Sequence, residues 1–338
     1  MEFISLDEFR SRHQEFDEAV RMTPGIPDYC SGSAWALAAH DTLRPPEHRL
    51  IPPLIVHENG HWLLFAQRPA QQGIFYFEPF EGHWLFTCPL VGPNPEFSMD
   101  LLKRSVERFS SSRPSCFLIG GVPNSGPLDQ TLSHLSGKFS VLQKAEGIPS
   151  MWINLHRDFN AFLSSKSRKF RKSIRTAQNL WNSHNISIEE VYGDSDYILS
   201  RLMSIEKRSW KFLDNQSIFQ ESHFLDFYSH MIESACINGD LRFLIASLEN
   251  IDFAYILGSR FGNTYRGWQM SFDESFRSLS PGNILQLENL KRRAEEGIDI
   301  YDLGMFAEYK MRWIDELRKL NIYVTLYSSA GSGRSSAG

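Results

Sequence analysis

The stretch from Thr264 to Glu308, TYRGWQMSFDESFRSLSPGNILQLENLKRRAEEGIDIYDLGMFAE, decides the fold. Its aromatic and β-prone beginning predicts a strand over Tyr265–Phe272, and the Ser-Pro-Gly at 280–282 breaks the chain before a helix. A second, short strand is predicted from Ile300 to Leu303. A strand followed by a turn and a helix N-terminus presents free N–H groups and the positive end of the helix dipole at one point. This arrangement suits an anionic ligand.

The helix in this stretch carries its own start and stop signals. Ser280 is a suitable N-cap, Pro281 a suitable first helical residue and Gly297 a suitable stop. Apolar residues recur at helical spacing, so one face is predicted to be buried: Ile284, Leu287, Leu290 and Ala294. An ordinary capped crossover helix explains the same pattern without any ligand.

The composition is typical of a globular chain with two domains of ordinary size. The chain has 338 residues, 42% of them hydrophobic, and a formal net charge of −5, which favours neither nucleic acid nor membrane as a partner. The four cysteines form no CxxC pair, so reduced thiols are expected rather than a zinc ribbon or a redox pair. No apolar run approaches the length of a membrane span, and the acidic N-terminus is unlike a secretory signal. We therefore expect a cytoplasmic protein.

One short motif suggests a metal site that its context argues against. Residues 57–61 read His-Glu-Asn-Gly-His and match the HExxH pattern of zinc proteases. That chemistry needs both histidines on one face of a helix. Asn59-Gly60 is instead a strong hairpin signal between two β-prone runs. We therefore expect a hairpin here and no metal.

A strongly basic helix is predicted in the second half. Between Phe159 and Ile188 the chain has no acidic residue. Cations cluster within this segment, at Lys166, Arg168, Lys169, Arg171, Lys172 and Arg175, and apolar residues recur at helical spacing, at Phe170, Ile174, Ala177 and Trp181. A solvated surface face explains the charges simply. A face of one sign is also the electrostatic footprint of phosphate ligands, so an anionic partner is expected.

The order of predicted elements indicates a mixed α/β fold with a partly antiparallel central sheet in the second half. In the first half we expect a helix over residues 1–22, another over 33–42, then strands, a helix over 101–109 and a strand over 116–120. These elements fit a degenerate copy of the same unit, without the Ser-Pro-Gly break. The expected domains are 1–145 and 146–327, followed by a flexible tail over 328–338.

The motifs of the second half, taken in order, resemble a known family. The basic helix is followed by helices and strands, then by Ser-Pro-Gly, a helix, Tyr-Asp-Leu-Gly at 301–304 and Tyr-Lys-x-x-Trp at 309–313. Over Met151–Ile314 this order resembles the acetyltransferases of the cellulose-biosynthesis type, which belong to the GNAT superfamily and are relatives of the Fem peptidyltransferases. The resemblance implies tandem GNAT-like domains, each a mixed central sheet flanked by helices, with the first degenerate.

The resemblance and the positions of polar residues at strand ends suggest roles in direct acyl transfer. Lys310 would stabilise developing negative charge or hold a donor phosphate, and Asp302 or Asp273 would be the base. The donor would be bound by Ser280, Gly282, Asn283, Ile284, Arg168, Arg171, Lys172 and Arg175. The acceptor would be bound by Arg208, Trp210, Gln269, Ser271 and Tyr309. A surface lysine, capping aspartates and a core tryptophan are the ordinary explanations for the same residues.

Three functions are consistent with these features. The first is an N-acyltransferase with acyl-CoA as co-substrate, no bound cofactor, and an amine of a small-molecule, sugar or peptide acceptor. The second is a Fem-like transferase that uses aminoacyl-tRNA, favoured by the basic helix and by the lack of the superfamily's Gln/Arg-x-x-Gly-x-Gly/Ala loop; a carrier protein is a further donor to consider. The third is a non-catalytic carbohydrate- or phosphate-binding module. Without a GxSxG elbow or a P-loop, covalent catalysis and phosphoryl transfer are not indicated.

Overall fold

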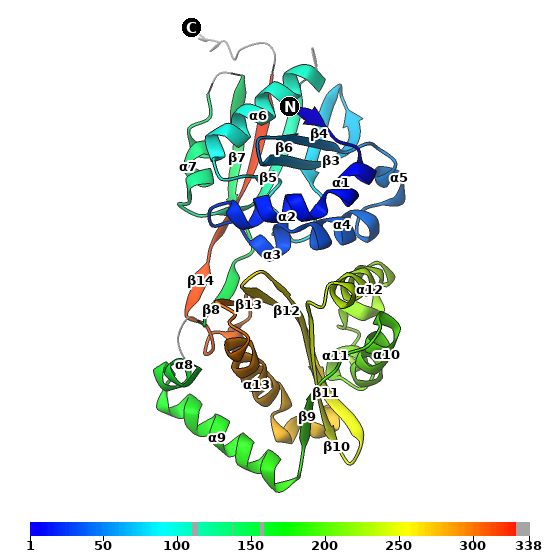
Figure 1. Cartoon of the computed structure of the whole chain (residues 1–338), viewed down its shortest axis with the longest axis vertical. Coiled ribbons are helices and arrows are strands. Elements are labelled where there is room, and N and C mark those ends of the chain that lie inside the picture. Colours follow the sequence, from blue (N-terminus) through cyan, green and yellow to red (C-terminus); the bar gives the residue numbers. More distant parts are fainter. Residues whose placement is uncertain (110–113, 137, 156–158, 329–338) are drawn as a thin grey trace. The chain divides into compact units, whose positions relative to one another are not determined.

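The structure is a computed structural model that describes residues 1–109, 114–136, 138–155 and 159–328 (Figure 1). The chain divides into two compact units. The first comprises Met1–Pro149 and the chain from Arg318 onward, and the second comprises Ser150–Leu317. Each unit is built around one mixed β-sheet flanked by helices, which confirms the expected α/β class.

The first unit has a sheet of order β1-β2-β3-β4-β6-β15-β7, with β5 paired to β3. Its elements are β1 (Glu2–Phe3), α1 (Leu6–Ser11), α2 (His13–Met22), α3 (Asp28–Ser31), α4 (Ser33–Thr42), α5 (Pro46–Arg49), β2 (Leu54–Glu58), β3 (His61–Gln71), β4 (Ile74–Pro79), β5 (Leu90–Val91), α6 (Pro95–Phe109), β6 (Ser115–Pro123), α7 (Pro127–Ser133), β7 (Phe139–Glu146) and β15 (Leu320–Tyr327). The single helix expected over residues 1–22 is divided, because Arg12 (φ −106°, ψ 17°) leaves helical geometry between α1 and α2.

The second unit has a sheet of order β14-β8-β13-β12-β11-β10-β9. Its elements are β8 (Ser150–Asn154), α8 (Phe159–Ser165), α9 (Arg168–Ser183), β9 (Ser187–Glu190), α10 (Ser195–Glu206), α11 (Trp210–Leu213), η1 (Ile218–Gln220), α12 (Ser222–Ile237), β10 (Leu241–Leu248), β11 (Ile251–Phe261), β12 (Thr264–Phe272), η2 (Glu274–Leu279), α13 (Pro281–Glu295), β13 (Ile300–Met305), η3 (Glu308–Lys310) and β14 (Glu316–Arg318). The strand, helix and strand predicted in the deciding stretch are therefore β12, α13 and β13.

The two sheets repeat the same path of the chain. In the first unit β2, β3 and β4 are antiparallel neighbours, α6 follows after β5, and β6 then pairs parallel to β4. In the second unit β10, β11 and β12 are antiparallel neighbours, α13 follows, and β13 then pairs parallel to β12. This repetition is the tandem architecture expected from the sequence.

The boundaries of the units differ from the expected domains of 1–145 and 146–327. The second unit begins at Ser150, and β15 lies in the sheet of the first unit, where it pairs with β6 and β7. The sequence of an apolar strand at the end of a chain does not indicate which sheet the strand joins, so sequence proximity alone assigns it to the second domain. Of the expected tail, residues 329–338 lie outside the described part of the chain.

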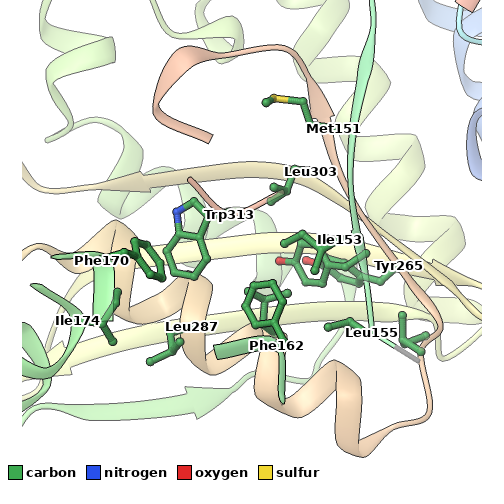
Figure 2. Packing of buried hydrophobic residues seen from close by; sticks show 13 residues of the cluster. Met151, Ile153, Leu155, Phe162, Phe170, Ile174, Tyr265, Leu287, Leu303 and Trp313 are labelled. Carbon is green, nitrogen blue, oxygen red and sulfur yellow. The ribbon is translucent and has the colours of Figure 1, made fainter. Parts of the chain in front are cut away.

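The apolar side of α9 and α13 packs into one core with β8, β12 and β13 (Figure 2). Phe170 of α9 meets Trp313 edge to face, with ring centroids 4.8 Å apart, and Leu287 of α13 belongs to the same cluster. The predicted helical stripe on α9 is buried at Phe170, Ile174, Ala177 and Trp181. The packing fixes the basic side of α9 and the first turn of α13 relative to the two parallel strands.

The register shift in β11 requires a glycine at position 258. Gly258 pairs with Gly267 of β12 where the register shifts after Leu257. A Cβ atom at Gly258 would lie 2.3 Å from the Arg266 carbonyl oxygen and 2.2 Å from the Tyr265 hydroxyl. We expect Gly258→Ala to lower the free energy of unfolding by about 1–3 kcal/mol, because backbone must move to admit the methyl group.

Gly267 provides a matched control in the same pair. The nearest atom to a Cβ there lies 3.7 Å away, so Gly267→Ala is expected to change the free energy of unfolding by less than about 1 kcal/mol. Urea unfolding of both variants tests this. Equal losses at the two glycines would show that strand propensity, and not the close contact, sets the effect.

Candidate active site

A cavity of about 600 Å³ lies within the second unit. Its walls come from β12, β13, α11, the first turn of α13 and the segment from Tyr309 to Trp313. We call it the wedge pocket. β12, α13 and β13 of the deciding stretch all contribute residues to its lining, so the strand-helix-strand unit predicted from the sequence does form a concave site.

The wedge pocket exists because two parallel strands diverge. β12 and β13 pair only from Thr264↔Ile300 to Arg266↔Asp302. Beyond this point β12 continues to Phe272 and β13 to Met305, and the cavity opens between them. In the described part of the chain, β12 has no strand partner on this side from Gly267 onward. Unpaired strand edges bind extended ligands through their backbone N–H and C=O groups.

The first turn of α13 closes one end of the wedge pocket. Ser280, Gly282 and Asn283 line the cavity, whereas Ile284 is buried in the core beneath it. Ser280 occupies the N-cap position but in the left-handed conformation (φ 54°, ψ 47°), and its side chain makes no capping hydrogen bond. The expected side-chain cap is therefore wrong, while Pro281 is the first helical residue as predicted. Because the first turn of α13 lines the cavity, the N-terminus of this helix is available to an anion.

Lys310 lies on the β13 side of the wedge pocket. Its Nζ donates hydrogen bonds to the carbonyl oxygens of Leu303 (2.7 Å) and Met305 (3.0 Å). Burial, reinforced by repulsion from Arg266, lowers the pKa of Lys310 to about 8, although Asp302 opposes the shift. A lysine beside a cavity whose pKa is lowered in this way is a candidate functional group.

Lys211 lies on the β12 side, and sequence reasoning missed it. Its Nζ donates a 2.8 Å hydrogen bond to the carbonyl oxygen of Met270, and burial lowers the pKa of Lys211. The neighbouring Trp210, a predicted acceptor residue, also lines the wedge pocket. No sequence motif distinguishes a lysine in a short aromatic helix. The only signal in the sequence is that Lys211 follows Trp210, a predicted acceptor residue.

Both aspartates proposed as the base lie outside the lining of the wedge pocket. Asp302 is 2% exposed and forms an ion pair with Arg266, whose Nη1 lies 2.5 Å from Oδ2. Its other oxygen accepts hydrogen bonds from the Ser150 hydroxyl and the Gly304 N–H, both at 2.7 Å. With both oxygens occupied, Asp302 orders the turn at the end of β13.

Asp273 caps η2 and forms an ion pair with Arg208, whose Nε lies 2.6 Å from Oδ2. Burial alone would raise its pKa, but hydrogen bonds from Ser275 and Arg208 hold the pKa of Asp273 below its usual value. Arg208 also donates to the carbonyl oxygens of Ser204 and Asp252. The structure thus places these two predicted site residues against each other, away from the cavity.

The remaining predicted acceptor residues do meet at the wedge pocket. Trp210, Gln269, Ser271 and Tyr309 all line it. Gln269 donates its amide N–H to the Tyr228 hydroxyl at 2.9 Å. The Ser271 hydroxyl is buried and has no hydrogen-bond partner among the described residues. An unsatisfied buried hydroxyl beside a cavity is a free donor for a ligand.

The basic helix α9 reaches this site along one side only. Lys169 and Lys172 line a neighbouring cavity of about 330 Å³, which shares Ser280 with the wedge pocket. Arg168 and Arg175 line neither cavity, and Arg171 donates to the Ser164 carbonyl oxygen at 3.3 Å. The basic helix predicted from the sequence therefore forms, and the structure separates its cations into two groups.

The HExxH-like segment forms the expected hairpin between β2 and β3. Asn59 (φ 51°) and Gly60 (φ 72°) are both left-handed, as a two-residue hairpin turn requires. Within the described ranges no group of three histidine, cysteine or acidic side chains is placed to hold a metal ion. No helix of the described chain combines the length and the apolar character needed to cross a membrane.

A family model described as "Acetyltransferase (GNAT) domain" matches residues 168–311. The match begins with α9 and ends just after Lys310, so it contains both diverging strands and α13. No curated protein matches the chain.

Solved structures show that the fold extends over both units. A conserved protein of unknown function from Bacteroides thetaiotaomicron has a TM-score of 0.65 at 11% identity, over 96% of this chain and 99% of that one. FemX has a TM-score of 0.64 at 14% identity, over 91% and 95%. The C-terminal domain of a putative lysylphosphatidylglycerol synthetase from Agrobacterium fabrum has a TM-score of 0.52 at 12% identity, over 91% and 92%.

The family match and the site together define the class of protein. Residues 168–311 of the second unit match a GNAT acetyltransferase domain, and the protein is an acyltransferase enzyme. Its whole-chain fold is similar to that of FemX. At these identities the structural neighbours show the fold alone.

Proposed function

We propose that the protein is an N-acyltransferase of the cellulose-biosynthesis type that transfers an acyl group from acyl-CoA to an amine by direct attack. The observation that carries this proposal is the wedge pocket, where an unpaired strand edge, a helix N-terminus and cations converge. Among the described residues that line it, the charged ones are Lys211, Arg277, Lys310 and Arg312, and none is acidic. The cytoplasm, where acyl-CoA is made, is the proposed location.

The α13 end of the wedge pocket fits the donor's phosphates. The N–H of Gly282 lies in the first turn, where the helix dipole favours negative charge. Arg312 donates to Asn283 Oδ1 at 2.5 Å, which holds its guanidinium at this end. Arg277 also lines the cavity, and Lys172 lies next to it across Ser280. We assign the donor's diphosphate to this group.

The free edge of β12 fits the amide-bearing arm of the donor. An extended chain with amides completes such an edge by hydrogen bonds, as an added strand does. This places the acyl group deeper between the strands, near Lys310. There the Lys310 ammonium stabilises the negative charge that develops on the acyl oxygen while the amine attacks. The amine attacks the thioester carbonyl as the free base, the C–S bond breaks, and the proton released from the amine nitrogen goes to the departing CoA thiolate, since no carboxylate lines the described pocket to accept it.

A second candidate, transfer from aminoacyl-tRNA, is supported by α9. Its cations lie on the exposed side of the helix, and in the described chain neither Lys169 nor Lys172 has an ion-pair partner. Single-sign helix faces bind nucleic-acid phosphates through counterion release. The acceptor under either donor is a small molecule, a sugar or a peptide with a free amine.

Calorimetric titration with acetyl-CoA tests the donor. We expect micromolar binding, weakened about tenfold or more by the double variant Lys169→Glu/Lys172→Glu, which reverses the charge beside α13. The control is Arg168→Glu/Arg175→Glu, which makes the same charge change on the same helix but away from the cavity. Its effect on acetyl-CoA binding should be less than about threefold.

Two results would redirect the proposal. If acetyl-CoA does not bind, acyl-CoA is not the donor, and charged tRNA becomes the next titrant. If both double variants then weaken tRNA binding equally, and the affinity falls steeply with salt, the whole face of α9 serves as a nucleic-acid site.

A further inference from the structure

Two lysine ammonium groups stand on opposite walls of the wedge pocket. Lys211 is anchored to the β12 wall through the Met270 carbonyl oxygen at 2.8 Å. Lys310 is anchored to the β13 wall through the carbonyl oxygens of Leu303 and Met305. They are close enough that repulsion from Lys211 contributes to the lowered pKa of Lys310. Two like charges therefore face one cavity.

Glu206 attracts Lys211 and Asp302 attracts Lys310 through space. Among the described residues, however, no acidic side chain lines the wedge pocket or accepts a hydrogen bond from either ammonium group. The Lys211 ammonium has three N–H donors, and only the bond to Met270 engages one of them within the described residues. Burial of a cation whose N–H donors are not all hydrogen-bonded is unfavourable in free energy unless an anion binds to it. An anionic group between the two walls would relieve both the repulsion and the unused donors.

Side chains alternate between the two faces of β12, and this alternation separates the Lys211 side of the wedge pocket from the donor end at α13. The Met270 side chain approaches Gly282 of α13, with its Cε 3.2 Å from where a Cβ of Gly282 would lie. Successive side chains point to opposite faces of a sheet, so Ser271 points away from α13, toward the side of α11. The Gln269 side chain also reaches that side, where it bonds to Tyr228 of α12. Lys211 and the Ser271 hydroxyl, which has no hydrogen-bond partner within the described residues, thus lie on the face opposite the donor's helix.

We propose that the acceptor amine carries a carboxylate, and that Lys211 and the Ser271 hydroxyl bind it. This inference rests on the proposed function, because it takes the α13 end as the donor's. Trp210 and Trp268 line the same cavity and provide flat apolar surface for the body of the acceptor. The substrate class is therefore an amino acid or another small amine that bears an acid group.

Benzoate and benzamide form a matched pair of probes for this site. They share size and ring, and only benzoate carries the negative charge. In calorimetric titrations of the full chain we expect benzoate to bind at least about tenfold more tightly than benzamide, since one charge-assisted contact accounts for a factor of that size. In Lys211→Gln the two affinities should become equal, and in Ser271→Ala the preference should fall about threefold.

Lys207→Gln is the control for the loss of a nearby positive charge. Lys207 precedes α11 by three residues, is exposed and does not line the wedge pocket. It should keep the preference for benzoate. If Lys211→Gln fails to fold, Lys211→Met provides the same test, because methionine fills similar volume without charge. Equal binding of benzoate and benzamide to the native chain, or a preference that survives both Lys211 variants, would overturn the inference.

The donor is measured separately in the same proteins, so the two proposals can fail independently. Lys211→Gln should leave acetyl-CoA binding unchanged within about threefold, since Lys211 lies on the opposite face from α13. A chain that binds acetyl-CoA but shows no preference for benzoate would refute the acceptor inference alone. A chain that binds benzoate through Lys211 but never binds acetyl-CoA would refute the donor and leave the carboxylate site standing.

Discussion

Replacing Lys310 with methionine is expected to lower kcat for acyl transfer by about 10²–10³-fold, with little change in the dissociation constant of acetyl-CoA. The ammonium is held against the backbone of β13 by two carbonyl oxygens, so it is preorganised to meet charge that develops on the acyl oxygen. Removal of one such preorganised donor typically has an effect of this size. Steady-state rates and calorimetry on the same variant separate the two quantities.

The pH profile distinguishes the possible roles of Lys310. Its pKa of about 8 means that the ammonium loses its proton as the pH rises through that value. If the charge stabilises the transition state, kcat falls above about pH 8 in the native enzyme, and Lys310→Arg, which cannot lose its charge, does not show this fall. A rate that instead rises through pH 8 and is lost in both variants would make Lys310 the base. Lys291→Met, on the exposed side of α13, is the control.

The lowered pKa of Lys310 also makes the free energy of unfolding depend on pH. The pKa of Lys310 is lower in the folded chain than its ordinary 10.5, so the folded state binds fewer protons than the unfolded state between about pH 8 and 10.5. Stability due to this group therefore rises with pH across that window, and a cost remains below it. Lys310→Met removes both the cost and this part of the pH dependence.

The sequence could predict those elements whose signals are local. Helix α13 begins at Pro281 and is followed by the left-handed Gly297, as its start and stop residues indicated. The second helix of the first half was expected over 33–42 and is α4, Ser33–Thr42. The hairpin at Asn59-Gly60 follows from turn chemistry alone. In each case the determining residues are neighbours in the chain, so periodicity and capping suffice.

Features that depend on contacts between distant residues could not be predicted. Strand β15 joins the first sheet through a register with β6 and β7 that no local pattern encodes. Lys211 reaches the cavity only because α11 packs beside Met270, a residue far along the chain. The two candidate bases follow strands, but strand ends do not reveal which carboxylates are already paired. Arg266, the partner of Asp302, lies on another strand.

Replacing Asp302 with alanine is expected to lower the free energy of unfolding by about 3–5 kcal/mol. The change leaves Arg266, which is 4% exposed, without its carboxylate, and it removes the acceptor of the Ser150 hydroxyl and the Gly304 N–H. A buried cation that loses its partner is penalised on this scale. Urea unfolding measures the loss. Glu295→Ala, which breaks an exposed 3.9 Å ion pair, should cost less than about 1 kcal/mol.

The double variant Arg266→Met/Asp302→Ala tests whether the pair is the cause. If it is, the double variant should be more stable than Asp302→Ala alone, with a coupling energy of about 2 kcal/mol or more, because no uncompensated charge remains.

Asp302→Asn then distinguishes a structural role from the base role suggested by the sequence. It keeps the shape of the side chain but cannot accept a proton at neutral pH. If Asp302 only orders the turn after β13, the folded Asn variant retains acyl transfer within about tenfold, since Lys310 keeps its own contacts. A variant as stable as the native chain that has lost more than a hundredfold in kcat would restore Asp302 as the base.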